Sequence, residues 1–192
     1  RLGIIRGEKI YARKCEIKEI STNDAKSFLN ENHLQGYCVS KYRLGLFFNN
    51  ELISVMTFGK SRHFVGHNED KMELLRFANK ININVIGGAS KLFSYFIKKY
   101  NPKEIVSYAD KRWSEGHLYD VLGFMKYNES KPNYYYIVGR KRIYRFNLRK
   151  SILVEKYGCP KDMSEREFCL KQKWYRIYDC GCLCYIWRND YD

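Results

Sequence analysis

The sequence contains little proline and no long apolar segment. Three prolines among 192 residues leave no proline-rich linker that would mark a boundary between domains. There is no run of about eighteen apolar residues and no signal-peptide pattern, so the sequence predicts neither a membrane span nor export. With 45% hydrophobic residues the chain can fill one core. We therefore expect a soluble intracellular protein.

The sequence also lacks the spacings of common metal sites and disulfide scaffolds. The four histidines form no H-E-x-x-H pattern, and the seven cysteines are odd in number without a C-x-x-C pair. Cys180, Cys182 and Cys184 alternate within DCGCLCYIW, which is compatible with a zinc site or with one row of buried cysteines on a strand. Strand alternation favours the buried row. We expect no metal.

Acidic residues are scarce relative to basic ones. The chain has 35 Lys and Arg against 21 Asp and Glu, a formal charge of +14, which attracts polyanions. Part of this excess is clustered after the aromatic run at 134–136, and its members are Arg140, Lys141, Arg142, Arg145, Arg149 and Lys150. Cationic side chains neutralise phosphates, and aromatic rings stack on exposed bases. This pattern favours nucleic acid as a partner over a merely solvated charged face.

Helix and strand patterns alternate along the first 140 residues. In the first half they predict a strand at 9–18, a helix from a cap at 21–24 to about residue 36, and strands at 42–48 and 51–58. A polar loop at 59–70, which contains His63 and His67, separates these from a strand at 72–77 and a helix at 91–100. A strand at 104–110, a short helix at about 114–122, and strands at 124–127 and 134–138 follow. Asn49-Asn50 between two strand-like runs is a strong hairpin signal.

A glycine loop stands between the strand at 72–77 and the helix at 91–100. Gly87 and Gly88 let the backbone turn tightly, and Ala89 and Ser90 lead into the helix. The first N–H groups of a helix have no partner within it, so they attract phosphate. The sequence therefore predicts a phosphate-binding loop at 87–90.

The last forty residues are expected to be an extension on the same domain. We assign 1–150 to the main domain and 151–192 to the extension, with Trp174 and Trp187 in the joint. Ser164 followed by Glu167 has capping-box spacing, so the segment SEREFCLKQK should be helical. YRIYDCG and LCYIW resemble the two arms of a hairpin.

The order hairpin, strand, glycine loop, helix, strand, helix, Gly-Phe and strand resembles the GNAT acyltransferase fold over about 15–140. The resemblance implies an α+β protein with a mixed, mostly antiparallel sheet flanked by helices, and acyl-CoA or another acyl donor as cofactor. In that superfamily an R/Q-x-x-G-x-G/A loop wraps the donor's pyrophosphate. Asn84, Gly87 and Ala89 match this loop here, with asparagine in place of Arg or Gln. The implied donor-binding residues are Asn84, Gly87, Gly88, Ala89 and Ser90.

Two further resemblances point to DNA. NELISVMTFGK, MELLRF and SYADKR are similar to segments of the Mom DNA-modification proteins of phage, which modify adenine. ENHLQGY, GGASKLF and RWSEGHLY are similar to the C-terminal regions of phage homing-endonuclease-like proteins that carry a Vsr-like or other nuclease domain upstream. The chain begins at Arg1 without a methionine, so we expect a fragment of a longer protein. We expect DNA as the partner, no membrane, and the host cell cytoplasm as the location if a phage encodes the chain.

Four residues are candidates for catalysis, each with a structural alternative. Tyr119 stands four residues before Gly123, where GNAT enzymes often place the tyrosine that protonates the leaving thiolate, but it could simply pack in the core. Glu73 is placed like the fourth-strand glutamates that sometimes act as base in that family, but it could form a surface ion pair with Arg76 or Lys71. Asp110 and Ser114 follow a strand end, where α/β sheets open their sites, but they could cap a helix.

Three functions remain open. The first is acyl transfer to a nucleobase amine, with Arg112 and Trp113 joining the basic cluster in DNA binding. The second is a non-catalytic DNA-binding module that targets an upstream nuclease. The third, a nuclease site inside this chain, ranks last because no H-N-H, GIY-YIG or carboxylate cluster for magnesium is present.

Overall fold

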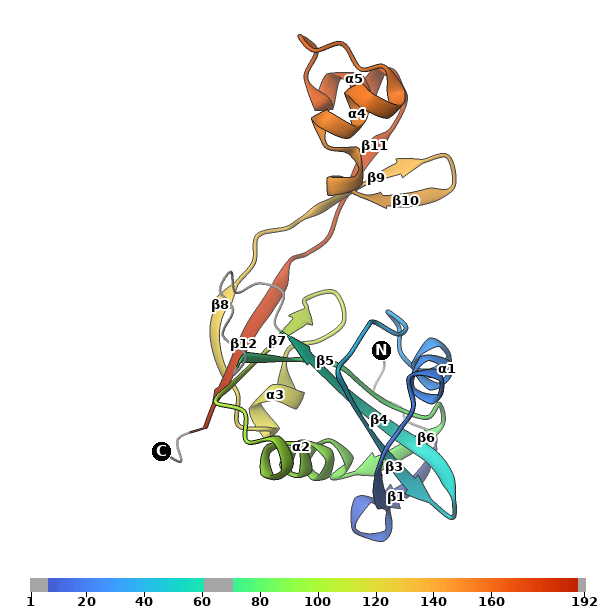
Figure 1. Ribbon diagram of the computed structural model, residues 1–192, viewed down its shortest axis with the longest axis vertical. Coiled ribbons are helices and arrows are strands. Elements are labelled where there is room, and N and C mark those ends of the chain that lie inside the picture. The colour runs from blue at the N-terminus through green and yellow to red at the C-terminus, as the bar shows by residue number, and fades with distance from the viewer. Residues whose placement is uncertain (1–6, 61–70, 190–192) are drawn as a thin grey trace. The chain divides into compact units, whose positions relative to one another are not determined.

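The computed structural model describes residues 7–60 and 71–189, which form two units (Figure 1). The first unit comprises the described parts of Arg1–Ala109, Gly116–Asn128 and Cys184–Asp192, and the second comprises Asp110–Glu115 and Glu129–Leu183. Residues 129–150, assigned above to the main domain, thus cluster with the second unit. Most of the predicted polar loop, with His63 and His67, lies outside the described residues.

In the described part of the first unit, the main element is one seven-stranded sheet. Its strand order is β2 (Glu16–Glu19), β3 (Tyr42–Phe48), β4 (Glu51–Lys60), β5 (Lys71–Asn79), β7 (Glu104–Asp110), β12 (Cys182–Arg188) and β8 (Met125–Glu129). The pairs from β2 to β5 are antiparallel, whereas β5 and β7 are parallel. A parallel pair needs a long crossover, and the chain between β5 and β7 supplies it with α2 (Gly88–Tyr100). The predicted mixed, mostly antiparallel sheet is confirmed.

The predicted hairpin is present between β3 and β4. Asn49 and Asn50 both adopt positive φ, 50° and 63°, the backbone that a two-residue turn needs to match the twist of its strands. Asparagine tolerates this conformation better than most residues. The local sequence therefore sets the register of the pair, in which Phe48 lies opposite Glu51.

Two helices cover opposite faces of this sheet (Figure 1). Helix α1 (Thr22–Asn32) packs on Val55 of β4, whereas α2 stacks Phe96 on Phe58 of the same strand, with ring centroids 3.6 Å apart. Because Val55 and Phe58 differ in parity along the strand, they project to opposite faces. Coverage of both faces explains why the residues of β4 from 53 to 59 are all buried.

The predicted strand at 9–18 is wrong in its continuity. The chain forms β1 (Glu8–Tyr11), a short 3-10 helix η1 (Ala12–Lys14) and β2, and the two strands belong to different sheets. β1 pairs in parallel with β6 (Ile83–Ile86), which precedes the glycine loop. Lys91 of α2 donates through Nζ to the carbonyl oxygens of Ala12 and Cys15, at 2.9 Å and 2.5 Å. The turn between the two strands is thereby fixed to the start of α2.

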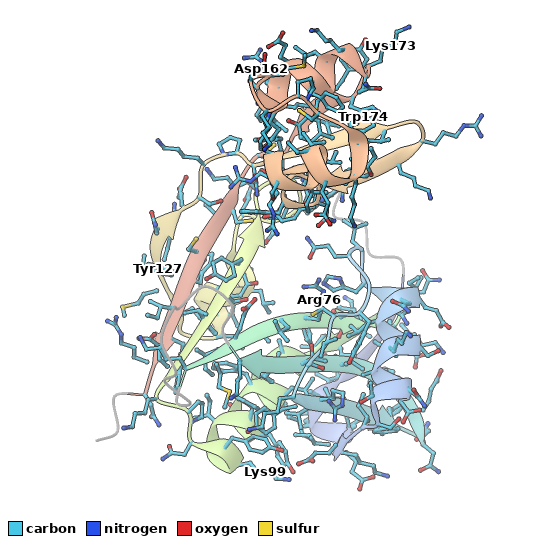
Figure 2. All side chains as sticks on the ribbon, turned by 45° about the horizontal axis from the view of Figure 1, so that its top comes forward. Arg76, Lys99, Tyr127, Asp162, Lys173 and Trp174 are labelled. Carbon is cyan, nitrogen blue, oxygen red and sulfur yellow. The ribbon has the colours of Figure 1, made fainter. Side chains whose placement is uncertain are left out.

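The second unit is a three-stranded antiparallel sheet packed against two helices. Its strand order is β10 (Lys141–Tyr144), β9 (Tyr134–Val138) and β11 (Tyr175–Tyr178), and the remaining elements are η2 (Arg145–Leu148), α4 (Lys150–Tyr157) and α5 (Glu165–Lys171). Its core contains Tyr136, Leu153 and Phe168, and Trp174, labelled in Figure 2, packs against it. Ser164 caps α5 by accepting a hydrogen bond from the Glu167 amide at 3.1 Å, as predicted.

Four expectations about the C-terminal part are wrong. β11 and β12 lie in different sheets, so they are not a hairpin, and β9 does not extend the large sheet. Cys180 precedes β12 and is exposed, so only Cys182 and Cys184 share a strand. Trp187 packs edge-on to Phe93 in the first unit, whereas Trp174 belongs to the second.

The loop after α1 gives a testable pH dependence. The Gln35 amide donates to Nδ1 of His33 at 3.1 Å, and Arg76 of β5 (Figure 2) donates to the Gly36 carbonyl at 2.9 Å. Burial, with the nearby charge of Arg76, lowers the pKa of His33 from 6.5 to about 4. Between these two values the unfolded chain binds a proton that the folded chain refuses, so stability falls as the pH drops through this range.

We expect that acidification from pH 6.5 to pH 4 removes about 2 kcal/mol through His33, allowing for partial screening by solvent. His33→Gln keeps an acceptor for the Gln35 amide but cannot titrate. Urea unfolding at both pH values should therefore show a smaller loss in the variant. An equal loss in both proteins would contradict the assignment.

Candidate functional site

The candidate site lies where two central strands separate. β5 and β7 pair only from Lys71 opposite Glu104 to Glu73 opposite Val106, although both strands continue. Immediately beyond, the hydroxyl of Ser107 donates to the carbonyl oxygen of Leu74 at 2.8 Å. A side chain therefore satisfies a buried carbonyl that has left the ladder, as buried backbone groups require.

Tyr119 is positioned at this point by a short helix. It lies on α3 (His117–Val121), and its hydroxyl is 3.0 Å from Oγ of Ser107 and 3.4 Å from the carbonyl oxygen of Tyr108. Its ring stacks on Tyr185 of β12, with centroids 4.5 Å apart, and contacts Phe124 edge-on at 5.6 Å. Tyr119 therefore packs in the core, as its structural alternative expected, and its hydroxyl also lies at the point where β5 and β7 separate. The ring is held while the hydroxyl reaches the separating strands.

The stacking of Tyr119 requires glycine at position 116. Gly116 is the N-cap of α3 with φ 95°, a conformation that side chains rarely adopt. A Cβ at this position would overlap the hydroxyl end of the Tyr185 ring. Close approach of the backbone to Tyr185 is what lets α3 present Tyr119.

Glu73 lies on the opposite face of the sheet from Tyr119. In the parallel register Glu73 is beside Val106, and Ser107, the contact of Tyr119, points to the other side. The Glu73 side chain belongs to a residue only 9% exposed. Burial, together with the phenol of Tyr127 and the carboxylate of Glu73, raises the pKa of Tyr108 well above its usual value. Glu73 and Tyr119 therefore face the separating strands from two sides.

Asp110 is bound to Arg112 within the second unit. The Arg112 Nε lies 2.9 Å from Oδ1 of Asp110, Nη2 pairs with the other oxygen, and the Arg112 amide donates to Oδ1 at 3.0 Å. The hydrogen bonds from Arg112 hold the pKa of Asp110 below its usual range. Such a carboxylate is a weak proton acceptor at neutral pH. The arrangement suits an anchor for the turn that carries Trp113, which is 62% exposed, and Ser114, whose amide donates to the Asp110 carbonyl.

The glycine loop has features that suit phosphate. Gly87 adopts φ 75° as the N-cap of α2, and no side chain among the described residues caps the helix. A Cβ on Gly88 would lie 2.9 Å from Cγ1 of Val85 on β6, so a larger residue at position 88 would push the start of α2 away from that strand. Asn84 lies on β6, three residues before Gly87. An uncapped start of a thirteen-residue helix fits the pyrophosphate of an acyl-CoA.

The predicted basic cluster divides into exposed and anchored members. Arg140, Lys141, Arg142 and Arg149 are exposed. The ammonium group of Lys150 donates to the carbonyl oxygens of Pro160 and Met163, so it supports the fold of the second unit. Arg145 lies over the rings of Tyr134 and Phe146 at 5.5 Å and 4.9 Å.

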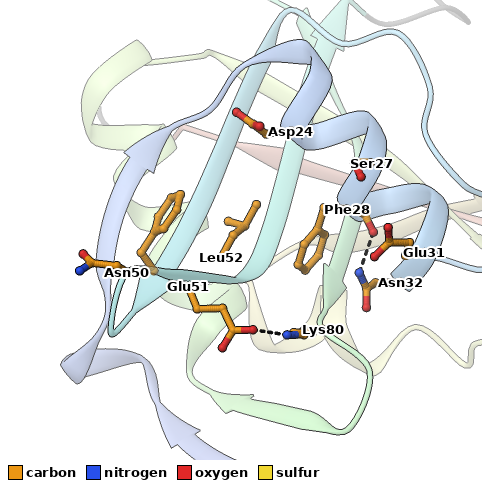
Figure 3. A pocket seen from close by; sticks show the side chains of 10 residues that line it. Asp24, Ser27, Phe28, Glu31, Asn32, Asn50, Glu51, Leu52 and Lys80 are labelled. Atoms are coloured by element: carbon orange, nitrogen blue, oxygen red, sulfur yellow. Dashed lines mark hydrogen bonds and ion pairs between the residues drawn. The ribbon is translucent and has the colours of Figure 1, made fainter.

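A separate groove lies between α1 and the β3–β4 turn (Figure 3). It measures about 490 Å³ and contains none of the predicted site residues. Asp24, Glu31 and Glu51 line it, and Lys80 is paired with Glu51. Three carboxylates against one paired lysine disfavour phosphate, so the groove does not suit DNA or a nucleotide cofactor.

The described residues contain neither a cluster of potential metal ligands nor a helix that could span a membrane. Within 7–60 and 71–189, no group of three or more His, Cys, Asp or Glu residues could hold a metal ion. In the same part of the chain, the helices are too short or too polar to cross a membrane.

Sequence reasoning missed the residues that hold Tyr119 in place. Ser107 and Tyr108 lie in the SYADKR segment that resembles Mom proteins but were given no role, and Tyr185 lies in no motif. Strand alternation could place Ser107 on one face of β7. The residues around Leu74, however, carry no signal that its carbonyl is unpaired with β7.

The fold is that of solved acetyltransferases. YncA, a putative acetyltransferase from Salmonella typhimurium solved with its cofactor acetyl-CoA, has a TM-score of 0.55 at 14% identity, covering 93% of this chain and 96% of the other. The ribosomal-protein-S18-alanine N-acetyltransferase from Escherichia coli has a TM-score of 0.54 at 12% sequence identity, covering 91% of this chain and 93% of the other. A Bacillus subtilis acetyltransferase in complex with CoA has a TM-score of 0.51 at 13% sequence identity, covering 92% of this chain and 99% of the other. These likenesses confirm the GNAT-like fold.

The sequence comparison adds a family. Residues 14–167 match the profile of the Mom protein family. This match confirms the resemblance to Mom noted from the strand motifs. No curated protein matches the chain.

Proposed function

Because the chain belongs to the Mom protein family, we propose that it transfers an acyl-type group to a nucleobase amine of DNA. The observation that supports this most is the Tyr119 hydroxyl, held 3.0 Å from Ser107 beside the point where β5 and β7 separate. Gly116, with φ 95°, and the stacking of Tyr119 on Tyr185 together bring the hydroxyl to this position. A tyrosine that only filled the core would not need both.

The loop at 87–90 is the proposed donor site. Backbone amides of Gly88, Ala89 and Ser90 at the start of α2 would hold the pyrophosphate, and Asn84 would approach it from β6. A bound acyl-CoA supplies an activated thioester carbonyl. The chain's own contribution is to hold that donor and to orient it.

Proton transfer is assigned to two residues on opposite sides of the sheet. An exocyclic amine of a base is a poor nucleophile, so it needs both positioning and removal of a proton. Glu73 would accept that proton, and Tyr119 would give one to the leaving thiolate. Asp110 and Ser114 would shape the turn that carries Arg112 and Trp113, which would contact DNA.

The test uses the intact chain, acetyl-CoA and plasmid DNA. After incubation, the DNA is digested and the nucleosides are analysed by mass spectrometry. We expect a nucleoside whose mass increases by the acyl group, and none when acetyl-CoA is left out. DNA that binds the chain but gains no mass with acetyl-CoA or longer acyl-CoA donors would contradict acyl transfer from CoA.

A non-catalytic DNA-targeting module, attached to an upstream nuclease, is the second candidate. Asparagine at position 84 in place of Arg or Gln favours it, as does Lys91, whose ammonium is engaged by Ala12 and Cys15. The two candidates differ in acyl-CoA affinity, which isothermal titration with acetyl-CoA measures directly. Absence of binding would favour the module.

DNA binding itself is predicted to depend on the exposed basic residues. Replacing Arg140, Lys141 and Arg149 together by alanine should weaken duplex binding about tenfold or more, and should lower the salt slope by about one for each phosphate that is no longer neutralised. Gel shifts at several salt concentrations measure both quantities. Lys26, Lys98 and Lys103, replaced together by alanine, serve as a charge-matched control. Equal affinities and salt slopes for the two triple variants would show that the basic cluster does not bind the duplex.

A further inference from the structure

The small sheet of the second unit has two different faces. Tyr134, Tyr136, Val138 and Ile143 belong to the face that packs on the core beneath α4 and α5. The alternate residues of the same strands point away from this core. In the described residues of the unit, none of these alternate residues belongs to the core cluster.

The outer face consists of two cross-strand rows. One row is Arg142, Ile137 and Tyr175, and the other is Tyr144, Tyr135 and Ile177. Tyr175 is 58% exposed, Ile177 48% and Tyr144 37%. Phe146, whose ring centroid is 5.4 Å from that of Tyr144, extends the second row. This outer face is an exposed layer of flat and branched apolar side chains.

Charge around the outer face is positive. The strands β9, β10 and β11 contain no Asp or Glu, and the segment 129–183 has thirteen Lys and Arg against six acids. Glu165 is bound by Tyr136 and Arg176 on the inner side. The guanidinium of Arg142 lies 4.4 Å from the centroid of the Tyr135 ring, so a cation and an aromatic ring are presented together.

We propose that this outer face binds unpaired bases of single-stranded DNA by stacking. The proposal rests on the proposed function, in which the chain acts on DNA. Aromatic rings offer a π-face to any base, and the surrounding cations attract the phosphates that connect the bases. Tyrosine and arginine suit this occupant, and the absence of carboxylates from the strands removes repulsion.

An unpaired strand is the fitting form of DNA for this face. In a duplex the flat sides of the bases are covered by their neighbours, so rings on a protein surface cannot stack on them. Enzymes that modify a base must in addition take it out of the stack. A face that stacks on unpaired bases would stabilise the opened strand while its target base reacts.

The experiment measures the full chain against a single-stranded oligodeoxynucleotide that carries 2-aminopurine. Stacking quenches the fluorescence of this base, so the wild type should quench it on binding. Tyr144→Ala and Tyr175→Ala should each weaken binding about fivefold or more, the effect of losing one stacked base, and should reduce the quenching. Because a tyrosine neutralises no phosphate, the salt slope should stay unchanged.

The matched control is Tyr178→Ala. Tyr178 is on β11 and is 60% exposed, but it pairs with Tyr134 and belongs to the other face. Its variant should bind and quench like the wild type. If Tyr144→Ala and Tyr175→Ala also behave like the wild type, the proposal is overturned. The same holds if both variants instead turn a dimer into a monomer in sedimentation, because the face would then bind protein. Either result leaves the duplex binding and acyl transfer of the proposed function standing, since those are measured separately.

Discussion

Replacing Tyr119 by phenylalanine is expected to slow acyl transfer to DNA by about 10²- to 10⁴-fold, the range for loss of a positioned general acid. Phenylalanine keeps the ring that stacks on Tyr185 and touches Phe124, so the fold should not change. Only the hydroxyl near Ser107 is removed. The rate of formation of the acylated nucleoside, followed by mass spectrometry, measures the effect.

The matched control for this prediction is Tyr95→Phe. Tyr95 lies on α2, and its hydroxyl accepts a hydrogen bond from Lys99 at 3.4 Å, away from the separating strands. This variant should react like the wild type. The affinities for acetyl-CoA and DNA should be the same in both variants, because the missing proton matters only in the transfer step. A Tyr119→Phe protein with the wild-type rate would exclude Tyr119 as the proton donor.

Gly116→Ala is expected to destabilise the protein by about 3 kcal/mol. Two costs add: the left-handed backbone, at about 1–3 kcal/mol, and overlap with the end of the Tyr185 ring, at about 1–3 kcal/mol. The midpoint of thermal unfolding should fall by about 6–12 °C. Acyl transfer should also fall at temperatures where the variant is folded, because displacement of Tyr185 removes the stacking partner of Tyr119.

Two comparisons separate the causes. Gly158 has φ 68° but nothing within 4 Å of an added Cβ, so Gly158→Ala carries the backbone cost alone and should lose less stability. Adding Tyr185→Phe to Gly116→Ala removes the atom that the methyl group meets first, and the double variant should recover part of the loss. Equal losses for Gly116→Ala and Gly158→Ala would show that the approach to Tyr185 is not tight.

Elements defined by local signals were predictable from the sequence. Asn49-Asn50 specifies its turn through positive φ, and the Ser21 hydroxyl caps α1 by accepting from the Asp24 amide at 3.1 Å. α2 ends at Tyr100 before Asn101-Pro102, as predicted. In each case the residues that determine the structure lie within a few positions of one another, so no knowledge of the rest of the chain is needed.

Pairings between distant short strands were not predictable. β1 and β6 are four residues each and far apart in sequence, and neither has a pattern that names its partner. The local pattern around Asp179 and Gly181 predicts a hairpin turn. Instead Oδ1 of Asp179 accepts from the amides of Asn133 and Gly181, at 2.7 Å and 2.9 Å, so the segment is a crossing between two sheets.

The candidate site was only partly predictable for the same reason. Tyr119 could be found because its spacing to Gly123 is local. Its partner Ser107 gains importance only because β5 and β7 stop pairing after Glu73, which is a property of the assembled sheet. Asp110 could be placed at a strand end, but its ion pair with Arg112 depends on the turn that follows.

The path of the chain through β8 and β12 has a consequence for how this protein can change. The two strands are neighbours in the large sheet, and the segment 129–183 lies between them in sequence. The Ser130 amide donates to the Cys182 carbonyl at 2.8 Å, and the Cys182 amide donates in turn to Oγ of Ser130. The ends of the segment are thus clasped together, as in an inserted module whose closure is already fixed by the host. Because the two ends of the segment are held together by their own hydrogen bonds, a change of length inside 129–183 would not need to alter the strand order of the large sheet.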